Sequence, residues 1–282
     1  MFRTQIDGAT LRGRLNDPDW LVVDVRHQLA DPAAGERAYA EGHLPGAVFL
    51  HLDRDLSGPM TGRNGRHPLP DPQDLVARFS QLGIGEKSQV VVYDDAGGMI
   101  ASRLWWLLRW LGHDAVALLD GGWPAWLAAG GATSREVPKR SAVRFEIRLR
   151  PRLLVELDEV QNNLQRQDFL LLDARSPDRF RGENETLDPV GGHIPGARNR
   201  FLKDNLTADG LLKPVAQLRA EYAEVLGGFP PGRVVHQCGS GVSACLNMLA
   251  MEHAGLVGSR LYAGSWSEWC ADPARPMVLR TA

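Results

Sequence analysis

Short apolar runs alternate with amphipathic segments along the whole chain. The short runs are rich in β-branched residues, which is typical of strands buried in a parallel sheet, and the longer segments place apolar residues at helical spacing. The predicted strands cover residues 20–25, 90–93, 169–173 and 234–236, and the predicted helices cover residues 72–82, 99–111, 215–226 and 242–254. Strands that alternate with helices predict an α/β fold, in which a mostly parallel sheet is flanked by helices on right-handed crossovers.

The pattern of the first half of the chain recurs in the second half. Residues 24–26 match 173–175, residues 42–47 match 192–197, residues 91–95 match 234–238, and residues 121–126 match 264–269. Landmarks that recur in the same order indicate that one domain has been duplicated. We therefore predict an N-terminal domain of residues 1–133, a charged linker of residues 134–151 and a C-terminal domain of residues 152–282.

The two halves differ at one chemically reactive position, where the first half has Asp95 and the second half has Cys238. Cys238 follows a predicted strand and precedes a predicted helix, at the edge where open α/β sheets bind ligands. A helix N-terminus favours a thiolate, and a free cysteine has a pKa of about 8.5. Gly239 and Gly241 permit the backbone to curl so that successive N–H groups converge on one anion. The sequence therefore predicts that Cys238 is a catalytic nucleophile.

The composition narrows the classes of function. With 282 residues, of which 44% are hydrophobic and 23% charged, the chain suits two ordinary globular domains. A formal net charge of −2 predicts no broad nucleic-acid surface, and no apolar run approaches the roughly 20 residues of a membrane helix. Three cysteines do not suggest a disulfide framework, so we expect a cytoplasmic protein in which Cys245 and Cys270 are small buried side chains. The sequence shows neither metal-ligand spacing nor a phosphate-binding loop, so no metal is expected.

The repeated motifs and the cysteine loop together resemble the tandem-domain rhodanese superfamily over most of the chain. The motifs that carry the resemblance are residues 24–26, 42–46, 120–126, 173–175, 192–197, 238–244 and 264–269. The resemblance implies two rhodanese-like domains, of which only the C-terminal one keeps the active cysteine. It also implies a sulfurtransferase that moves sulfane sulfur from a small donor to a thiol or cyanide through a persulfide on Cys238. Thioredoxin is then a candidate acceptor, and no cofactor is implied.

The loop after the cysteine bears on the identity of the donor. Thiosulfate sulfurtransferases usually place basic residues there, whereas the residues that follow Cys238 are uncharged. The loop resembles that of the 3-mercaptopyruvate sulfurtransferases, with Ser243 in place of a threonine. Mercaptopyruvate is therefore the favoured donor and thiosulfate the alternative. The loop residues implied in substrate binding are Gly239, Gly241, Val242, Ser243 and Ala244.

The same resemblance implies that Arg179 anchors the carboxylate of the donor, a task suited to the two parallel N–H groups of a guanidinium. The mercaptopyruvate enzymes have a second arginine shortly downstream. In this chain residues 183–188 are acidic and contain no arginine. The sequence offers Arg181, Arg198 and Arg200 as candidates for that second role.

A Ser–His–Asp relay is also implied by the resemblance. The matching residues are Ser240, His67 and Asp55, with Asp53 as a neighbouring candidate for the acid. Such a relay could polarise a hydroxyl near the reacting thiol or shuttle its proton. His43 and His193, by contrast, recur in equivalent turns of both halves, and we expect them to be structural.

Two other functions remain open at this point. A persulfide relay module that hands sulfur between proteins would also use Cys238, but it would turn over every small donor slowly. A phosphatase with the same single-domain fold needs an arginine six residues after its cysteine to hold the phosphate. Ala244 occupies that position here, which disfavours a phosphatase.

Overall fold

The computed structural model describes residues 1–279 and divides the chain into two compact units. Unit 1 contains residues 1–58, 69–150 and 208–212. Unit 2 contains residues 59–68 and 151–207, and the described residues from 213 onward. The expected linker therefore lies almost wholly in unit 1, where the side chain of Phe145 is buried and its backbone N–H donates to Ser80. The short segment 59–68, expected in the N-terminal domain, packs within unit 2.

Each unit contains one five-stranded parallel sheet, as the alternating pattern predicts. The strands of unit 1 are β1 (Gln5–Ile6), β2 (Trp20–Asp24), β3 (Val48–Phe49), β4 (Gln89–Tyr93) and β5 (Val116–Leu119), in the order β1-β5-β4-β2-β3. The strands of unit 2 are β6 (Leu154–Val155), β7 (Leu170–Asp173), β8 (Arg198–Asn199), β9 (Val234–Gln237) and β10 (Arg260–Tyr262), in the order β6-β10-β9-β7-β8. The two orders are the same once duplicated strands are matched, which confirms the α/β fold and the repeat.

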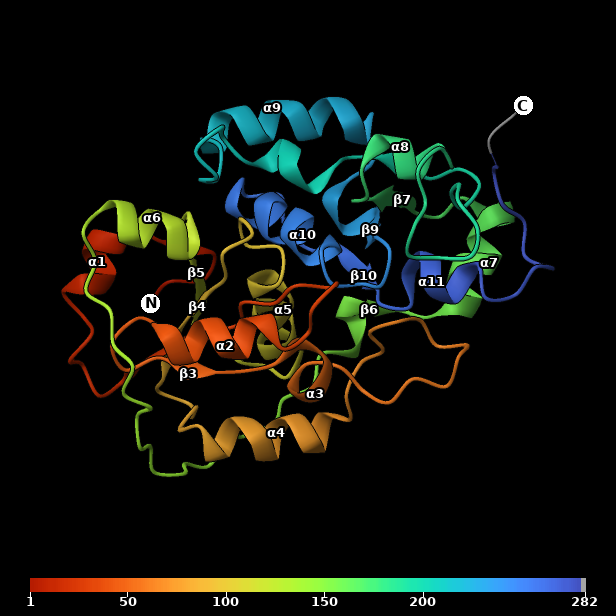
Figure 1. Ribbon diagram of the computed structural model, residues 1–282. Coiled ribbons are helices and arrows are strands. Elements are labelled where there is room, and N and C mark those ends of the chain that lie inside the picture. The colour runs from red at the N-terminus through yellow and green to blue at the C-terminus, as the bar shows by residue number, and fades with distance from the viewer. Residues whose placement is uncertain (280–282) are drawn as a thin grey trace. The chain divides into compact units, whose positions relative to one another are not determined.

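The helices of each unit lie beside its sheet (Figure 1). Those of unit 1 are α1 (Gly8–Arg12), α2 (Ala34–Glu41), α3 (Leu52–Asp55), α4 (Pro72–Gln81), α5 (Ala101–Trp110) and α6 (Gly122–Ala128). Those of unit 2 are α7 (Leu157–Arg166), α8 (Pro177–Phe180), α9 (Val215–Leu226), α10 (Ala244–His253) and α11 (Ser265–Trp269), with short 3-10 turns η1 (Pro151–Leu153), η2 (Leu202–Asn205) and η3 (Pro231–Arg233). The four predicted helices correspond to α4, α5, α9 and α10 to within two residues at each end.

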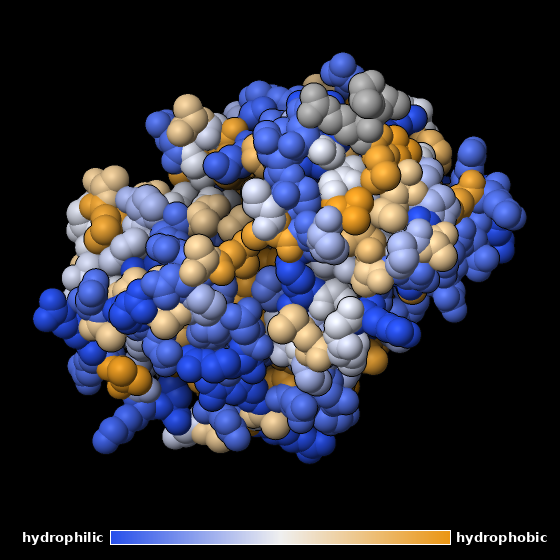
Figure 2. Space-filling view, turned by 45° about the vertical axis from the view of Figure 1, so that its right-hand side comes forward, coloured by the Kyte–Doolittle hydropathy of each residue, from blue (hydrophilic) through white to orange (hydrophobic). Residues whose placement is uncertain are grey.

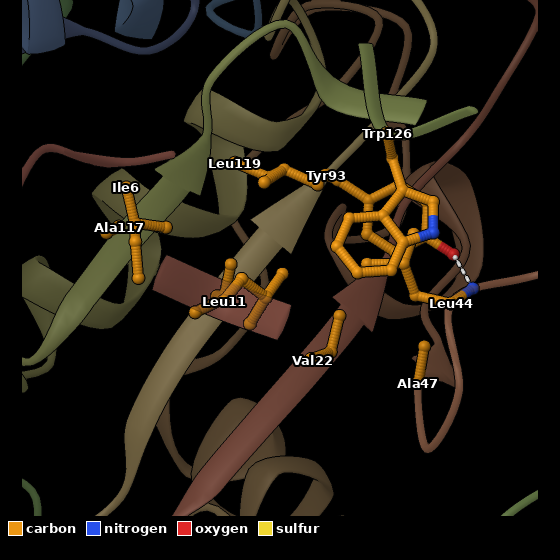
Figure 3. Close-up of a cluster of buried hydrophobic side chains, with 10 residues drawn as sticks. Ile6, Leu11, Val22, Leu44, Ala47, Tyr93, Ala117, Leu119 and Trp126 are labelled. Atoms are coloured by element: carbon orange, nitrogen blue, oxygen red, sulfur yellow. Dashed lines mark hydrogen bonds between the residues drawn. The ribbon is translucent and has the colours of Figure 1, made fainter. Parts of the chain in front are cut away.

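The core of unit 1 is built from apolar side chains of neighbouring strands and of the flanking helices (Figure 3). Val22, Val91 and Ala117 come from the three central strands, and Trp126 of α6 covers them. Unit 2 repeats this arrangement with Leu171 and Val235 under Trp266 and Trp269. Removing such large apolar surfaces from water is the main favourable contribution to the free energy of folding.

A buried ion pair closes the end of β2 and of β7, the strands next to the central strand of each sheet. In unit 2, Arg175 donates to both carboxylate oxygens of Asp173, at 2.7 Å from Nη2 to Oδ2, and also to the carbonyl of Gly192 at 2.7 Å. In unit 1, Arg26 makes the same bonds to Asp24 and to the carbonyl of Gly42. The guanidinium therefore ties the strand end to the following Gly-His turn, which explains why these motifs recur together.

The histidines of those turns have structural contacts. His43 stacks on Tyr39 with ring centroids 3.9 Å apart, and its Nδ1 lies 2.8 Å from the Tyr39 carbonyl. His193 stacks on Phe180 at 3.8 Å, and its Nδ1 lies 2.9 Å from the Phe180 carbonyl. Both rings thus lock a turn to the preceding helix, as the repetition predicts.

Polar side chains cover most of the face seen in Figure 2, with apolar residues in small groups between them. Among the described residues, the large apolar side chains that are exposed come from many parts of the chain, for example Met60, Val137 and Val257, and only Val278 and Leu279 are adjacent. Such scattered exposure is ordinary for a globular protein. Every helix in the described part of the chain is too short or too polar to cross a membrane.

Replacing Arg175 with leucine should destabilise the protein by about 3–5 kcal/mol, because the Asp173 carboxylate would stay buried without its cation. Urea unfolding followed by circular dichroism measures this loss. Arg166→Leu is the matched control, since Arg166 pairs with Asp168 on the surface, where such a pair contributes less than about 1 kcal/mol. Equal losses in the two variants would contradict the structural role of Arg175.

Candidate active site

The loop that carries Cys238 joins β9 to α10 and is held by the start of α11. The backbone N–H of Cys238 donates to Ser265 Oγ at 3.1 Å, and the Cys238 carbonyl accepts from the N–H of Trp266 at 3.0 Å. The Gly239 carbonyl accepts from the N–H of Ser267 at 2.9 Å. Cys238 itself is buried, with 1% of its surface exposed. Hydrogen bonds therefore hold Cys238 at the carboxyl end of β9, the central strand of its sheet, where the sequence predicts it.

Gly241 is required for the path of this loop. Its φ is +76°, and a Cβ at this position would lie 2.2 Å from the carbonyl oxygen of Ala263. The backbone can turn back into α10 only because that side chain is absent. The remaining loop residues, Val242, Ser243 and Ala244, complete the turn into the first residues of α10.

The structure brings together two members of the predicted relay. His67, from the segment 59–68, places Nδ1 2.7 Å from Ser240 Oγ, and both side chains are buried. Which of the two groups donates depends on the tautomer of the histidine. Ser240 lies two residues after Cys238 in the same loop.

Asp55 belongs to α3 in unit 1. Its Oδ2 accepts from the backbone N–H of His51 at 2.7 Å, and its Oδ1 lies 3.0 Å from Nε of Arg78. Asp53 is more exposed and lies about 4 Å from the rings of His27 and His51. The part of Asp55 in the relay remains a prediction.

Arg179, the predicted anchor, lies beside the loop at the end of α8. A Cβ added to Gly239 would lie 3.5 Å from Nη2 and 3.8 Å from Nη1 of Arg179. Glu185 holds the guanidinium from the other side through two hydrogen bonds, at 3.0 Å from Nε and 2.8 Å from Nη2. The acidic segment 183–188 thus fixes the orientation of the arginine.

A second guanidinium lies beside the same glycine, and it comes from Arg66. Its Nη2 is 2.8 Å from the position of a Cβ on Gly239. Its Nη1 donates to the carboxylate of Asp188, which is also 3.5 Å from Arg179. Burial lowers the pKa of Arg66, and the nearby Cys238 opposes this shift. The sequence alone predicts no role for Arg66, although this residue directly precedes His67.

The three arginines suggested by the sequence for the second role have other partners. Arg181 is exposed and pairs with Glu183 at 2.8 Å. Arg198 donates to the carbonyl of Val225 at 2.8 Å, and Arg200 pairs with Glu221 at 2.6 Å. Their contacts hold other parts of unit 2, so the expectation that one of them faces the loop is not met.

The equivalent loop of unit 1 is filled by a carboxylate of the chain itself. The sheet register aligns Asp94, and not the predicted Asp95, with Cys238, because Tyr93 pairs with Asp24 as Gln237 pairs with Asp173. Asp94 is buried and accepts four backbone N–H groups at 2.8–2.9 Å, from Ala96, Gly98, Ile100 and Ala101. The residue before this position donates to the strand-end aspartate in both units, as the Tyr93 hydroxyl to Asp24 and as the Gln237 amide to Asp173, each at 2.6 Å. The first loop is therefore satisfied internally, whereas the second loop has no acidic residue at this position.

The other two cysteines are buried, as predicted. Cys245 lies in the first turn of α10, with Sγ 3.5 Å from the Gly241 carbonyl. Burial raises the pKa of Cys270, which keeps it as a thiol at neutral pH.

One group of side chains in the described part of the chain has the spacing of a metal site. The ligand atoms of His27, His51 and Asp53 in unit 1 all lie within 4.8 Å of one another. However, Nδ1 of His51 accepts the backbone N–H groups that begin α3, and its Nε2 lies 2.9 Å from the Pro32 carbonyl. An ion would displace these hydrogen bonds, so we assign no metal to this group.

Comparison with known proteins identifies relatives of the whole chain. The family model described as "Rhodanese-like domain" matches residues 7–129 and again residues 156–272. The chain is 48% identical over 270 residues to a probable 3-mercaptopyruvate sulfurtransferase of Pseudomonas aeruginosa, with 95% of each chain covered. It is 39% identical over 283 residues to the putative thiosulfate sulfurtransferase SseB of Mycobacterium tuberculosis, covering 98% of this chain and 97% of that one.

A solved structure shows the same fold. The 3-mercaptopyruvate sulfurtransferase from Leishmania major superposes with a TM-score of 0.85 at 31% identity, covering 95% of this chain and 74% of that one. The match extends over both duplicated halves, so the fold derived from the sequence pattern agrees with that of a solved relative.

Changing Gly241 to alanine should abolish the loop geometry, because the new Cβ would meet the Ala263 carbonyl. We expect a destabilisation of about 1–3 kcal/mol from the strained backbone and a greater than tenfold loss of any Cys238-dependent turnover. Gly228→Ala is the control, because Gly228 also has a positive φ but no atom within 4 Å of its Cβ position. Comparable losses of activity in both variants would show that backbone strain, and not the contact with Ala263, is responsible.

Proposed function

The chain belongs to the rhodanese-like family and is a sulfurtransferase, and we propose that it carries sulfane sulfur as a persulfide on Cys238, with 3-mercaptopyruvate as the favoured donor. The observation that carries this proposal is the position of Cys238. It lies on a neutral, glycine-rich loop, beside two guanidinium groups and the Ser240–His67 pair. A nucleophile, an anion-binding group and a proton-handling pair are the three parts that the reaction needs.

In the first half-reaction the Cys238 thiolate attacks the sulfur of the donor. A sulfur–sulfur bond forms and the carbon–sulfur bond breaks, so the electron pair of that bond passes to the enolate of pyruvate. The proton of the donor thiol ends on the methyl carbon of pyruvate, and Cys238 is left as a persulfide anion. The N–H groups of residues 239–244 stabilise this anion by the same electrostatic principle as an oxyanion hole.

In the second half-reaction an acceptor removes the outer sulfur. Cyanide attacks it and leaves as thiocyanate, and the electron pair of the sulfur–sulfur bond returns to Cys238 as the thiolate. A thiol acceptor, such as a small thiol or thioredoxin, takes the sulfur as its own persulfide. Each turn of the cycle is therefore free of net oxidation or reduction, and no cofactor is needed.

The charges around the loop favour a donor with one negative charge. The guanidinium groups of Arg66 and Arg179 face the carboxylates of Glu185 and Asp188, which are only 4% and 2% exposed. Since the charges are balanced within this group, it has little excess to offer a dianion. Thiosulfate is the second candidate, because two guanidinium groups beside Gly239 can still bind a sulfonate and a relative at 39% identity carries that name.

The free cysteines bear on the cellular compartment of the protein. We place it in the cytoplasm, because its three cysteines are all free thiols and a reducing compartment keeps them so. The two-domain division suggested by the repeat, with residues 134–151 as the connection, remains our assignment for the evolutionary domains. Small-molecule donors and thiol acceptors are the partners that this reaction requires.

The donor is identified by steady-state turnover with 3-mercaptopyruvate and with thiosulfate, each against cyanide. We expect kcat/KM to be at least tenfold higher for mercaptopyruvate, about 1.4 kcal/mol of transition-state discrimination. Cys238→Ser should abolish both reactions, and Cys245→Ser is the matched control that should leave them intact. A preference for thiosulfate would reverse the donor assignment, and turnover that survives in Cys238→Ser would refute the persulfide mechanism. If neither donor is used, a persulfide relay between proteins becomes the better description.

The Ser240–His67 pair should accelerate the reaction of 3-mercaptopyruvate but not that of thiosulfate. Pyruvate leaves as an enolate that must gain a proton at carbon, whereas sulfite leaves thiosulfate as a stable anion. Ser240→Ala and His67→Gln are therefore expected to lower kcat for mercaptopyruvate by about 100-fold, the low end of general acid–base contributions, and that for thiosulfate by less than threefold. Asp55→Asn should show the same selective loss if Asp55 completes the relay. Equal losses with both donors would mean that the pair only supports the loop.

A further inference from the structure

The acidic segment 183–188 lies beside the loop that carries Cys238, where Glu185 and Asp188 face Arg179. The segment contains no arginine of its own. Both carboxylates are almost fully buried, at 4% and 2% exposure. Buried carboxylates are costly unless a cation faces them, so their burial points to guanidinium groups held in place on the loop side.

Arg66 is held in that place by backbone and side-chain contacts within unit 2. Its N–H donates to Ser267 Oγ at 3.1 Å, and the preceding Gly65, with φ +83°, lies so close that a Cβ there would be 2.8 Å from the Gly264 carbonyl. Gly264 and Ser267 flank the start of α11, which also holds Cys238. The arginine and the reactive cysteine are thus fixed by the same short helix.

The two guanidinium groups present their outer nitrogens to the same glycine. Asp188 engages Nη1 of Arg66, while Nη2 of Arg66 lies 2.8 Å from the Cβ position of Gly239. Glu185 engages Nε and Nη2 of Arg179, and Nη2 and Nη1 lie 3.5 Å and 3.8 Å from the same position. Because Gly239 has no side chain, both guanidinium groups can lie this close to the backbone next to Cys238. Both arginines are partly exposed, at 28% and 20%, so a small anion can reach them.

We propose that Arg66 is the second donor-recognition residue of this enzyme, and that it clamps the carboxylate of the donor together with Arg179 over Gly239. Asp188 is the positioning residue that holds both guanidinium groups at the correct spacing. The assignment rests on the proposed function for the identity of the donor, but the anion site itself does not depend on it. With Arg66 in this role, the donor carboxylate can be bound by two arginines although the acidic segment 183–188 contains none.

Kinetics of Arg66→Gln provide the first test, with 3-mercaptopyruvate as the donor. Loss of a charged hydrogen-bond donor to a carboxylate should raise KM by about tenfold or more, with kcat changed by less than threefold. Arg66→Lys keeps the charge but loses the planar fork, and it should fall between the wild type and Arg66→Gln. Arg166→Gln, on the exposed face of α7, is the matched control and should leave KM unchanged. An unchanged KM in a folded Arg66→Gln variant would overturn the proposal.

A second test does not require any particular donor. The rate of Cys238 alkylation is measured with iodoacetate, which is an anion, and with iodoacetamide, which is neutral and of similar size. The wild-type ratio of the two rates should exceed that of a free cysteine, and it should fall about tenfold or more in Arg66→Gln and not in Arg166→Gln. If no small donor is turned over but the ratio still falls, the anion site stands and the donor assignment fails. A ratio that Arg66→Gln leaves unchanged, or a thiol that neither reagent reaches, would overturn the assignment of Arg66.

Gly239→Ala tests the space between the two arginines. Gly239 has no left-handed backbone angle, so alanine is compatible with its conformation, but the new methyl group would lie against Nη2 of Arg66. We expect the same loss of preference for iodoacetate as in Arg66→Gln, with melting temperature reported for each variant. A Gly239→Ala protein that folds and keeps the wild-type ratio would place the anion elsewhere.

Discussion

The active loop of this protein depends on one buried guanidinium. Arg175 is paired with Asp173 at the end of β7, donates to the Gly192 carbonyl, and lies over the ring of Trp266 with its Cζ 4.8 Å from the ring centroid. The backbone N–H of Trp266 in turn holds the carbonyl of Cys238. A central strand, a turn, the start of α11 and the reactive cysteine are therefore joined through a few short contacts. Because an unpaired charge in the interior is so costly, these elements are constrained to one arrangement.

Unit 1 contains the same buried ion pair, but its loop after β4 differs from the loop that carries Cys238. Arg26 pairs with Asp24 and lies 4.5 Å from the ring centroid of Trp123, so its sheet and turn are built in the same way. The loop after β4, however, wraps its N–H groups around the carboxylate of Asp94. These internal hydrogen bonds hold the loop of unit 1 in place. The two halves thus share one scaffold and differ at one position of this loop, which is Asp94 in unit 1 and Cys238 in unit 2.

Electrostatic balance distinguishes the site from a simple basic pocket. Glu185 and Asp188 hold the guanidinium groups of Arg66 and Arg179 rigidly, so their geometry is set before any substrate arrives. Preorganised donors lose little entropy when an anion binds, and the balance of charge limits their attraction for dianions. The acidic segment looks unfavourable for an anionic donor when read along the sequence, but it holds the two guanidinium groups of the proposed anion site.

The sequence by itself determined the α/β fold, the duplication and the position of Cys238, because these depend on local signals. Strand runs, helical spacing and a glycine-rich turn are short-range patterns, and they recur in order in both halves. The family resemblance also implied that Ser240 and His67 act together, and the structure places these two residues, far apart in the chain, in contact. Only the tertiary structure decided which arginine faces the loop. Three arginines are nearer to Arg179 in sequence but bind other partners, namely Arg181, Arg198 and Arg200. Arg66 is far away in sequence, but it lies in segment 59–68, which packs in unit 2. Charge pairing acts through space and is set by packing, so the order of residues along the chain does not encode it directly.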